Sequence, residues 1–172
     1  GDVTDIQVNC PTIDVSGTVT GLAAGRTLRL LNNGGDAKTV SSNTGFLFKS
    51  PSVFDSTTYA ITVGTQPVGQ TCTVTNGSGT AGTAVTNVAV ACVTNTHTVG
   101  GSVTGLGGGE SVGLLLNGGS ALTVSSNTTF TFGTSLDYGT AYAVTVSTQP
   151  AGAVCTVNNG SGTVAGNVVN VQ

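Results

Sequence analysis

The chain has 172 residues, a formal net charge of −3 and only 6% charged residues, against roughly 25% in an average soluble domain. Its four Lys and Arg residues form neither the basic stripe that binds nucleic acid nor the polybasic patch that binds anionic lipid. No apolar run reaches the roughly 18 residues of a membrane span, so we expect no nucleic-acid partner and no membrane insertion.

The chain begins with a strand pattern that stands outside any repeat. The stretch VTDIQVNC at 3–10 nearly repeats VTNVAVAC at 85–92, which closes a longer unit. Successive side chains of a strand point to opposite faces. We therefore interpret 1–11 as a donor-like overhang, in which Val3, Ile6 and Val8 pack as a donated strand.

A first module is expected at 12–92. Short runs rich in Val, Thr, Tyr and Phe alternate with a period of two, and clusters of Gly, Asn and Ser separate them. Seven short strands at this spacing favour an antiparallel β-sandwich. The predicted strands lie near 13–20, 27–32, 37–41, 45–49, 58–64, 70–75 and 84–92.

Two cysteines of this module are predicted to form a disulfide. Cys72 lies in the sixth predicted strand and Cys92 ends the seventh, and a hairpin folded near residue 82 sets them opposite each other. Closing such a loop stabilises a protein by about 3 kcal/mol on the chain-entropy model. Because disulfides persist in oxidising compartments, we expect the protein outside the cell or in a periplasm.

A short linker at 93–96 leads to a second module at 97–172. SGTVTGL at 16–22 returns as GGSVTGL at 100–106, and the offset of 84 residues becomes 83 after one deletion. Such self-similarity indicates duplication of one unit. The expected fold is all-β, with two tandem antiparallel seven-stranded sandwich modules that form a rod.

The motifs resemble those of transthyretin-like sandwiches, which include Cna B-type and carboxypeptidase-regulatory domains. The matching stretches are VSGTVTGL, TVSSNTGFLF and YAITVGTQPVGQTC. More closely, both units resemble almost end to end the tandem Ig-type modules of bacterial secreted and surface proteins. This resemblance implies an Ig-like module that serves as a stalk or spacer on the bacterial cell surface, and it implies no activity.

The sequence departs from Cna B-type domains in its lysines. Those domains often carry an isopeptide bond between a lysine and an asparagine. The first unit has only Lys38 and Lys49, and the second unit has no lysine. We therefore expect no isopeptide bond in the second unit.

The second module is predicted to lack part of its last strand. Cys155 corresponds to Cys72, whereas Gln172 aligns with Ala89, three positions before the counterpart of Cys92. Within its own module, Cys155 is therefore expected to have no cysteine partner.

The leading hypothesis is an assembly of identical subunits. The N-terminal strand of one chain would add to the edge carried by Val169 and Val171 in the next chain, as in donor-strand exchange. Cys10 would then be bonded to Cys155 of the neighbour. Contacts of this head-to-tail kind propagate into a filament unless the geometry closes.

Two alternatives stay open. Residues 168–172 already resemble the first half of a seventh strand, so the donated strand competes with them for part of one edge. The C-terminal residues then either move aside or pair on the far side of the donated strand. If the polypeptide continues past residue 172, the chain is an excised pair of modules from the stalk of a bacterial adhesin. A third interpretation is a module that contacts a cell surface or glycans, through exposed aromatic side chains such as Tyr138.

The sequence gives no pattern for catalysis or metal binding. The seven Asp and Glu residues are scattered, and none occurs in a matching pair in the two units. His97, the sole histidine, is interpreted as a strand or linker residue, and GLGGGE at 105–110 lacks the GK[ST] ending of a phosphate loop. We expect no enzyme activity, no cofactor and no metal site.

Overall fold

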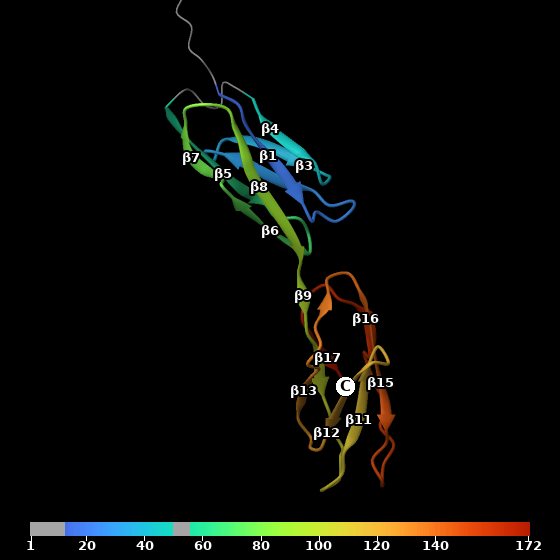
Figure 1. The fold of residues 1–172 in the computed structure, drawn as a ribbon. Helices are drawn as coiled ribbons and strands as arrows, with labels where there is room; N and C mark the ends of the chain where they lie inside the picture. Colours follow the sequence, from blue (N-terminus) through green and yellow to red (C-terminus); the bar gives the residue numbers. More distant parts are fainter. Residues whose placement is uncertain (1–12, 50–55) are drawn as a thin grey trace, which may run out of the picture. The chain divides into compact units, whose positions relative to one another are not determined.

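A computed structural model describes residues 13–49 and 56–172, and within these ranges the chain is all-β (Figure 1). It divides into two compact units, unit 1 up to Val93 and unit 2 from Thr94. No helix long and apolar enough to cross a membrane occurs in the ranges described. The expected overhang at 1–11 lies outside them.

Unit 1 consists of two four-stranded sheets, ordered β4-β1-β8-β6 and β3-β2-β5-β7 (Figure 1). Alternating residues of both sheets bury one face in a single apolar core, which gives the unit a sandwich-like build. The strands are β1 (Val15–Thr20), β2 (Leu28–Asn32), β3 (Asp36–Val40), β4 (Gly45–Phe48), β5 (Thr57–Thr65), β6 (Gln70–Thr75), β7 (Ser78–Ala81) and β8 (Val85–Thr94).

Unit 2 repeats this plan with shorter pairings. Its sheets have the orders β13-β10-β17, β12-β11-β15-β16 and β14-β9, and they surround a second core. The strands are β9 (Thr96–His97), β10 (Val99–Ser102), β11 (Val112–Leu116), β12 (Ser120–Val124), β13 (Thr129–Thr131), β14 (Leu136–Asp137), β15 (Ala141–Thr148), β16 (Ser161–Thr163) and β17 (Val168–Val171).

Pairs of phenylalanines anchor both cores, as the sequence predicts from their spacing of two. Phe46 and Phe48 lie edge to face with ring centroids 6.0 Å apart, and Phe130 and Phe132 repeat this geometry at 5.7 Å. All four rings are buried. Edge-to-face contacts of this kind add about 0.5–1.5 kcal/mol beyond the burial of area.

The expectation of purely antiparallel sheets is wrong for one pair of strands in each unit. β1 pairs in parallel with β8, and β10 pairs in parallel with β17. Period-two alternation buries the same face of a strand in either direction, and only a short hairpin connection forces antiparallel pairing. Because nearly a whole unit separates the two strands of each pair, the sequence pattern left their direction open.

The described part of unit 1 contains one strand more than the seven predicted. The Gly-rich segment that we expected to be a plain turn includes β7, which pairs with β5 in the opposite sheet. β6 and β8 nevertheless remain neighbours, as the hairpin interpretation requires. The predicted linker at 93–96 is mostly strand, because β8 runs to Thr94 and β9 begins at Thr96.

One asparagine in each unit ties the turn after the first strand to the rest of the sandwich. The Asn43 side chain accepts a hydrogen bond from Leu22 N at 2.8 Å and donates one to Leu22 O at 3.0 Å. Asn127 makes the same two bonds to Leu106, at 2.8 and 3.0 Å. The SSN motif at 41–43 and 125–127 thus supplies the same pair of hydrogen bonds in both repeats.

We expect Asn127→Ala to lower the free energy of unfolding of unit 2 by about 1–3 kcal/mol, because it leaves two part-buried backbone groups unpaired. Asn43→Ala should have the same effect on unit 1. Both decreases in the free energy of unfolding can be measured by chemical denaturation, with hydrogen exchange as the readout for each unit. The matched control is Asn167→Ala, which removes only one exposed hydrogen bond, donated by Thr98 N. Equal decreases in the free energy of unfolding in all three variants would contradict a stabilising role for the Asn43 and Asn127 bonds.

Candidate functional site

The disulfide predicted in unit 1 is confirmed. Cys72 Sγ and Cys92 Sγ are 2.01 Å apart, and the two side chains are 3% and 6% exposed. The bond joins β6 to β8 at the end of the sheet. Both cysteines belong to the apolar core of unit 1.

A glutamine from the TQP motif positions the cysteine strand in each unit. Gln66 Oε1 accepts a hydrogen bond from Cys72 N at 2.7 Å, and its Nε2 donates to Cys72 O at 2.9 Å. Gln149 repeats both bonds with Cys155, at 2.7 and 3.1 Å. Cys155 is therefore held in the orientation that Cys72 has in unit 1.

Cys155 is nevertheless a free thiol among the described residues, and it is half-buried. Asn158 and Gln172 form an antiparallel pair that exchanges two backbone hydrogen bonds, of 2.6 and 3.0 Å. Cys155 lies three residues before Asn158, so its cross-strand position lies three residues beyond Gln172. In unit 1 the corresponding position is occupied by Cys92.

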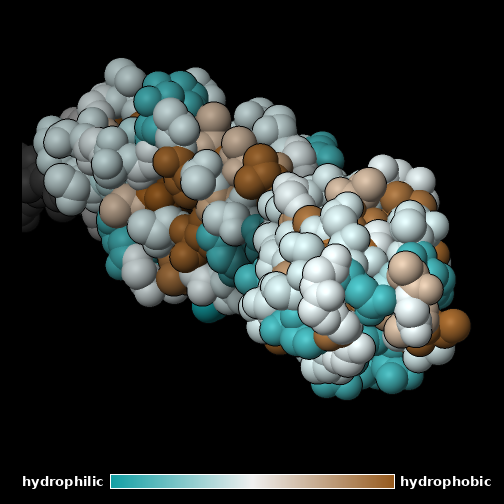
Figure 2. All heavy atoms as spheres, turned by 90° about the horizontal axis from the view of Figure 1, so that it is seen from below, coloured by the Kyte–Doolittle hydropathy of each residue, from teal (hydrophilic) through white to brown (hydrophobic). Residues whose placement is uncertain are grey.

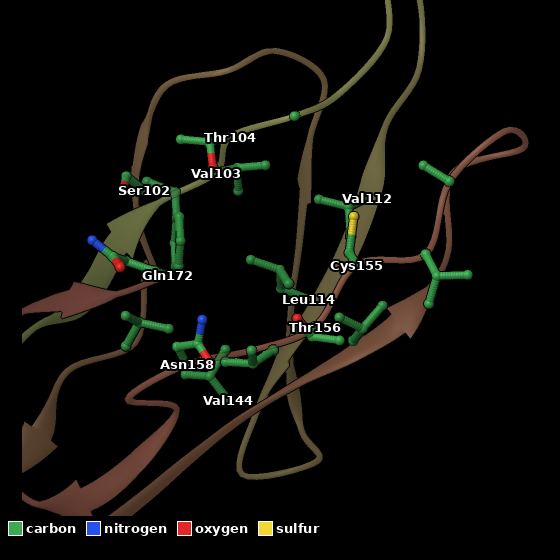
Figure 3. Close-up of a pocket in the computed structure, with 17 residues that line it drawn as sticks. Ser102, Val103, Thr104, Val112, Leu114, Val144, Cys155, Thr156, Asn158 and Gln172 are labelled. Atoms are coloured by element: carbon green, nitrogen blue, oxygen red, sulfur yellow. The ribbon is translucent and has the colours of Figure 1, made fainter.

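A cavity of about 390 Å³ opens beside this thiol, and we call it the Cys155 groove (Figure 3). Ser102, Val103 and Thr104 border it on the side of β10, and Cys155 and Thr156 border it on the other side. Its inner wall is apolar and comes from both sheets, through Val112, Leu114, Phe130 and Val144. The sulfur of Cys155 lies at one wall of the groove.

The burial of equivalent residues differs between the two units at this groove. Val19 is 2% exposed and Cys72 is 3% exposed, whereas Val103 and Cys155 are only half-buried. Residues 153–158 correspond to β6 but form no strand. An extended segment in the groove would pair with this edge and with Val103, and would complete the sheet as β8 does in unit 1.

The predicted acceptor residues lie next to the groove. Val169 is 77% exposed and Val171 is 1% exposed, and both belong to β17, which pairs with β10. The groove is bordered by Val103, Thr104 and the stretch 153–158. Sequence reasoning missed these border residues, although the offset of 84 between Val19 and Val103 contains the signal. The predicted donor residues Val3, Ile6, Val8 and Cys10 lie outside the described ranges.

Of the three tyrosines, only Tyr138 was suggested as an exposed glycan contact, and it is less open than the sequence suggested. Tyr59 and Tyr142 are core residues, each 8% exposed. Tyr138 is half-buried, with its ring centroid 6.3 Å from that of His97. In the described residues, no group of three His, Cys, Asp or Glu side chains is arranged to hold a metal ion.

The surface carries few charges and few large apolar side chains. The face drawn in Figure 2 is mostly pale, as expected for a chain rich in Gly, Ser and Thr. The large exposed apolar residues in the described ranges are Val68, Val93, Val154 and Val169. Val154 belongs to the 153–158 edge and is 82% exposed, so the groove is bordered by apolar surface outside as well as inside.

No protein-family model matches the chain, and no curated protein matches it. The resemblance to transthyretin-like and Cna B-type modules therefore stays a prediction.

Proposed function

We propose that the protein is a structural subunit of an extracellular filament, in which residues 3–10 of one copy add as a strand at the Cys155 groove of the next. The observation that carries this proposal is the groove itself, with its apolar wall and its half-buried free thiol. An unpaired sheet edge of this kind binds an extended segment through backbone hydrogen bonds, and its side-chain pockets select the sequence.

The donor is identified by its likeness to the strand that fills the same place in unit 1. VTDIQVNC matches VTNVAVAC, so Val8 and Cys10 correspond to Val90 and Cys92. Val90 and Cys92 are 1% and 6% exposed, and both belong to the core of unit 1. Val8 would fill the apolar part of the groove, and Cys10 would lie beside Cys155.

A disulfide between Cys10 and the Cys155 of the neighbouring subunit would lock the contact. It forms by exchange with a low-molecular-weight disulfide, RSSR, such as oxidised glutathione. Two thiols become one protein disulfide, and RSSR is reduced to two molecules of RSH. An oxidising compartment outside the cell supplies such an oxidant.

Donor and acceptor belong to different parts of the chain, so each subunit presents one of each. Contacts of this heterologous kind continue from subunit to subunit and build a filament. Each insertion also pairs remaining backbone groups of the stretch 153–157, which removes an exposed template for unspecific strand pairing. In this proposal each unit is an Ig-like module of transthyretin-like type, and the filament lies at the bacterial cell surface.

We expect native material to give a ladder of multimers in non-reducing electrophoresis and a single monomer band after reduction. Electron microscopy of the same material should show filaments, and Cys10→Ser should abolish the ladder while both units stay folded. A monomer band without reductant, or an internal Cys10–Cys155 bond found by peptide mass mapping, would overturn the proposal.

A second candidate function is a stalk segment of a larger surface adhesin. It is favoured by the Asn158–Gln172 pair, which directs β17 toward the groove, so that following residues of the same polypeptide would enter it. The intact mass of the native protein separates the two functions. A longer polypeptide without a ladder supports the stalk, and a ladder of 172-residue subunits supports the filament.

A further inference from the structure

We propose that the donated strand replaces β17, so that assembly is an exchange of one strand for another. This inference rests on the proposed filament function and adds the mode of insertion. In each acceptor subunit, β17 would pair with β10 only until the N-terminal strand of another subunit displaces it.

The register of the donor follows from the cysteines. With Cys10 opposite Cys155, Gln7 lies opposite Asn158, at the position that Gln172 occupies. Residues 3–7 of the donor then coincide with residues 168–172, and only 8–10 enter the open part of the groove. Because a slip by one residue turns every side chain to the other face, no neighbouring register buries Ile6 and Val8.

The sheet has no room for both strands in this register. A Cβ atom added to Gly101 would lie 1.8 Å from Val171 O, so the backbone of β17 presses directly against β10. On the other side, Gln172, which directly follows β17, is hydrogen-bonded to Asn158. Gly17 has the same close contact with β8, at 2.0 Å from Val88 O. One strand fits beside this glycine in each unit, and the donor must therefore take the place of β17.

The exchange conserves the contacts along β17. Ile6 takes the place of Val171, which is 1% exposed, and it brings one additional methylene group. Thr4 takes the place of Val169, which is 77% exposed, so an apolar side chain in water is replaced by a polar one. The remaining substitutions are Val3 for Val168, Asp5 for Asn170 and Gln7 for Gln172. The net gain then comes from residues 8–10, which add new pairs.

β17 is a short strand with few buried contacts. It has four residues, and its one deeply buried side chain is Val171. A short strand with few buried contacts opens at low free energy, and the groove next to it gives the donor a place to start.

The test uses the full chain carrying Cys10→Ser as acceptor, and a synthetic peptide of residues 1–12 whose Cys10 is a mixed disulfide with thionitrobenzoate. The Cys155 thiolate attacks the Cys10 sulfur, the new disulfide forms, and thionitrobenzoate leaves and is measured by its absorbance. We expect amides of Val168–Val171 to exchange hydrogen at least ten-fold faster in the cross-linked product than in the acceptor. The amide of Asn158 should stay protected, because Gln7 becomes its partner.

Two matched peptides serve as controls. Ile6→Asp places a carboxylate on the buried face, and it should leave β17 protected and slow the release of thionitrobenzoate at least ten-fold. Thr4→Asp places the same charge on the exposed face, and it should behave as the original peptide does. Cross-linking with unchanged protection of β17 would overturn the exchange and leave the filament proposal intact. Absence of cross-linking in the folded acceptor, with normal reaction in denaturant, would overturn the filament proposal.

Discussion

Replacing Val8 by Asp is expected to abolish filament formation, although Cys10 and Cys155 both remain. In the proposed register Val8 enters the Cys155 groove, whose lining includes Leu114 and Phe130. A carboxylate transferred there without a partner loses its hydration, and this costs several kcal/mol. Because affinity falls ten-fold for each 1.4 kcal/mol, we expect docking to weaken by more than a hundred-fold. Sedimentation of assembled material and electron microscopy measure the loss.

Asn9→Asp is the matched control for this prediction. Asn9 corresponds to Ala91, which is exposed on the outer face of β8. The added charge should therefore leave assembly within a few-fold of the original level. Equal assembly by the Val8→Asp and Asn9→Asp variants would show that Val8 does not enter an apolar site, and would contradict the proposed register.

Removing the disulfide of unit 1 with the double substitution Cys72→Ser and Cys92→Ser is expected to have the largest effect on stability. The bond closes a loop with a sequence separation of 20 residues, which corresponds to about 3 kcal/mol on the chain-entropy model. For a unit of this size, such a loss lowers the melting temperature by more than about 10 °C. Differential scanning calorimetry of the double variant measures the shift.

Cys155→Ser is the control, because it replaces a cysteine sulfur by a hydroxyl oxygen but breaks no disulfide. We expect it to leave the melting of unit 1 unchanged. Reduction of the original protein should reproduce the melting curve of the double variant. A shift below about 2 °C in both experiments would contradict a stabilising role for the Cys72–Cys92 bond.

Repetition and alternation made much of unit 1 predictable. The period of two placed Phe46 and Phe48 in the core, and the register around residue 82 paired Cys72 with Cys92, as the structure confirms. These features depend on side chains close in sequence or on a single hairpin. A repeat also transfers such local geometry to the second unit, where Phe130 and Phe132 follow it.

Other features depend on contacts that alternation does not encode. The parallel pairing of β1 with β8 concerns strand direction over a long connection, and β7 forms in a Gly-rich segment that reads as a turn. The ring of Tyr138 packs against His97, although the LDYG motif suggested an exposed tip. The Cys155 groove lies between two sheets, and its walls come from residues that are far apart in the sequence.

The parallel pairing of the first and last strands of unit 1 has a mechanical consequence. A force that pulls the start of β1 and the end of β8 apart acts along both strands in opposite directions. The ladder between them is then sheared, and its evenly spaced bonds share the load and are not opened one after another. A donated strand in the place of β17 would run beside β10 in the same way. When a filament of such subunits is pulled along its length, the parallel strand pairs would thus be the part most resistant to unfolding.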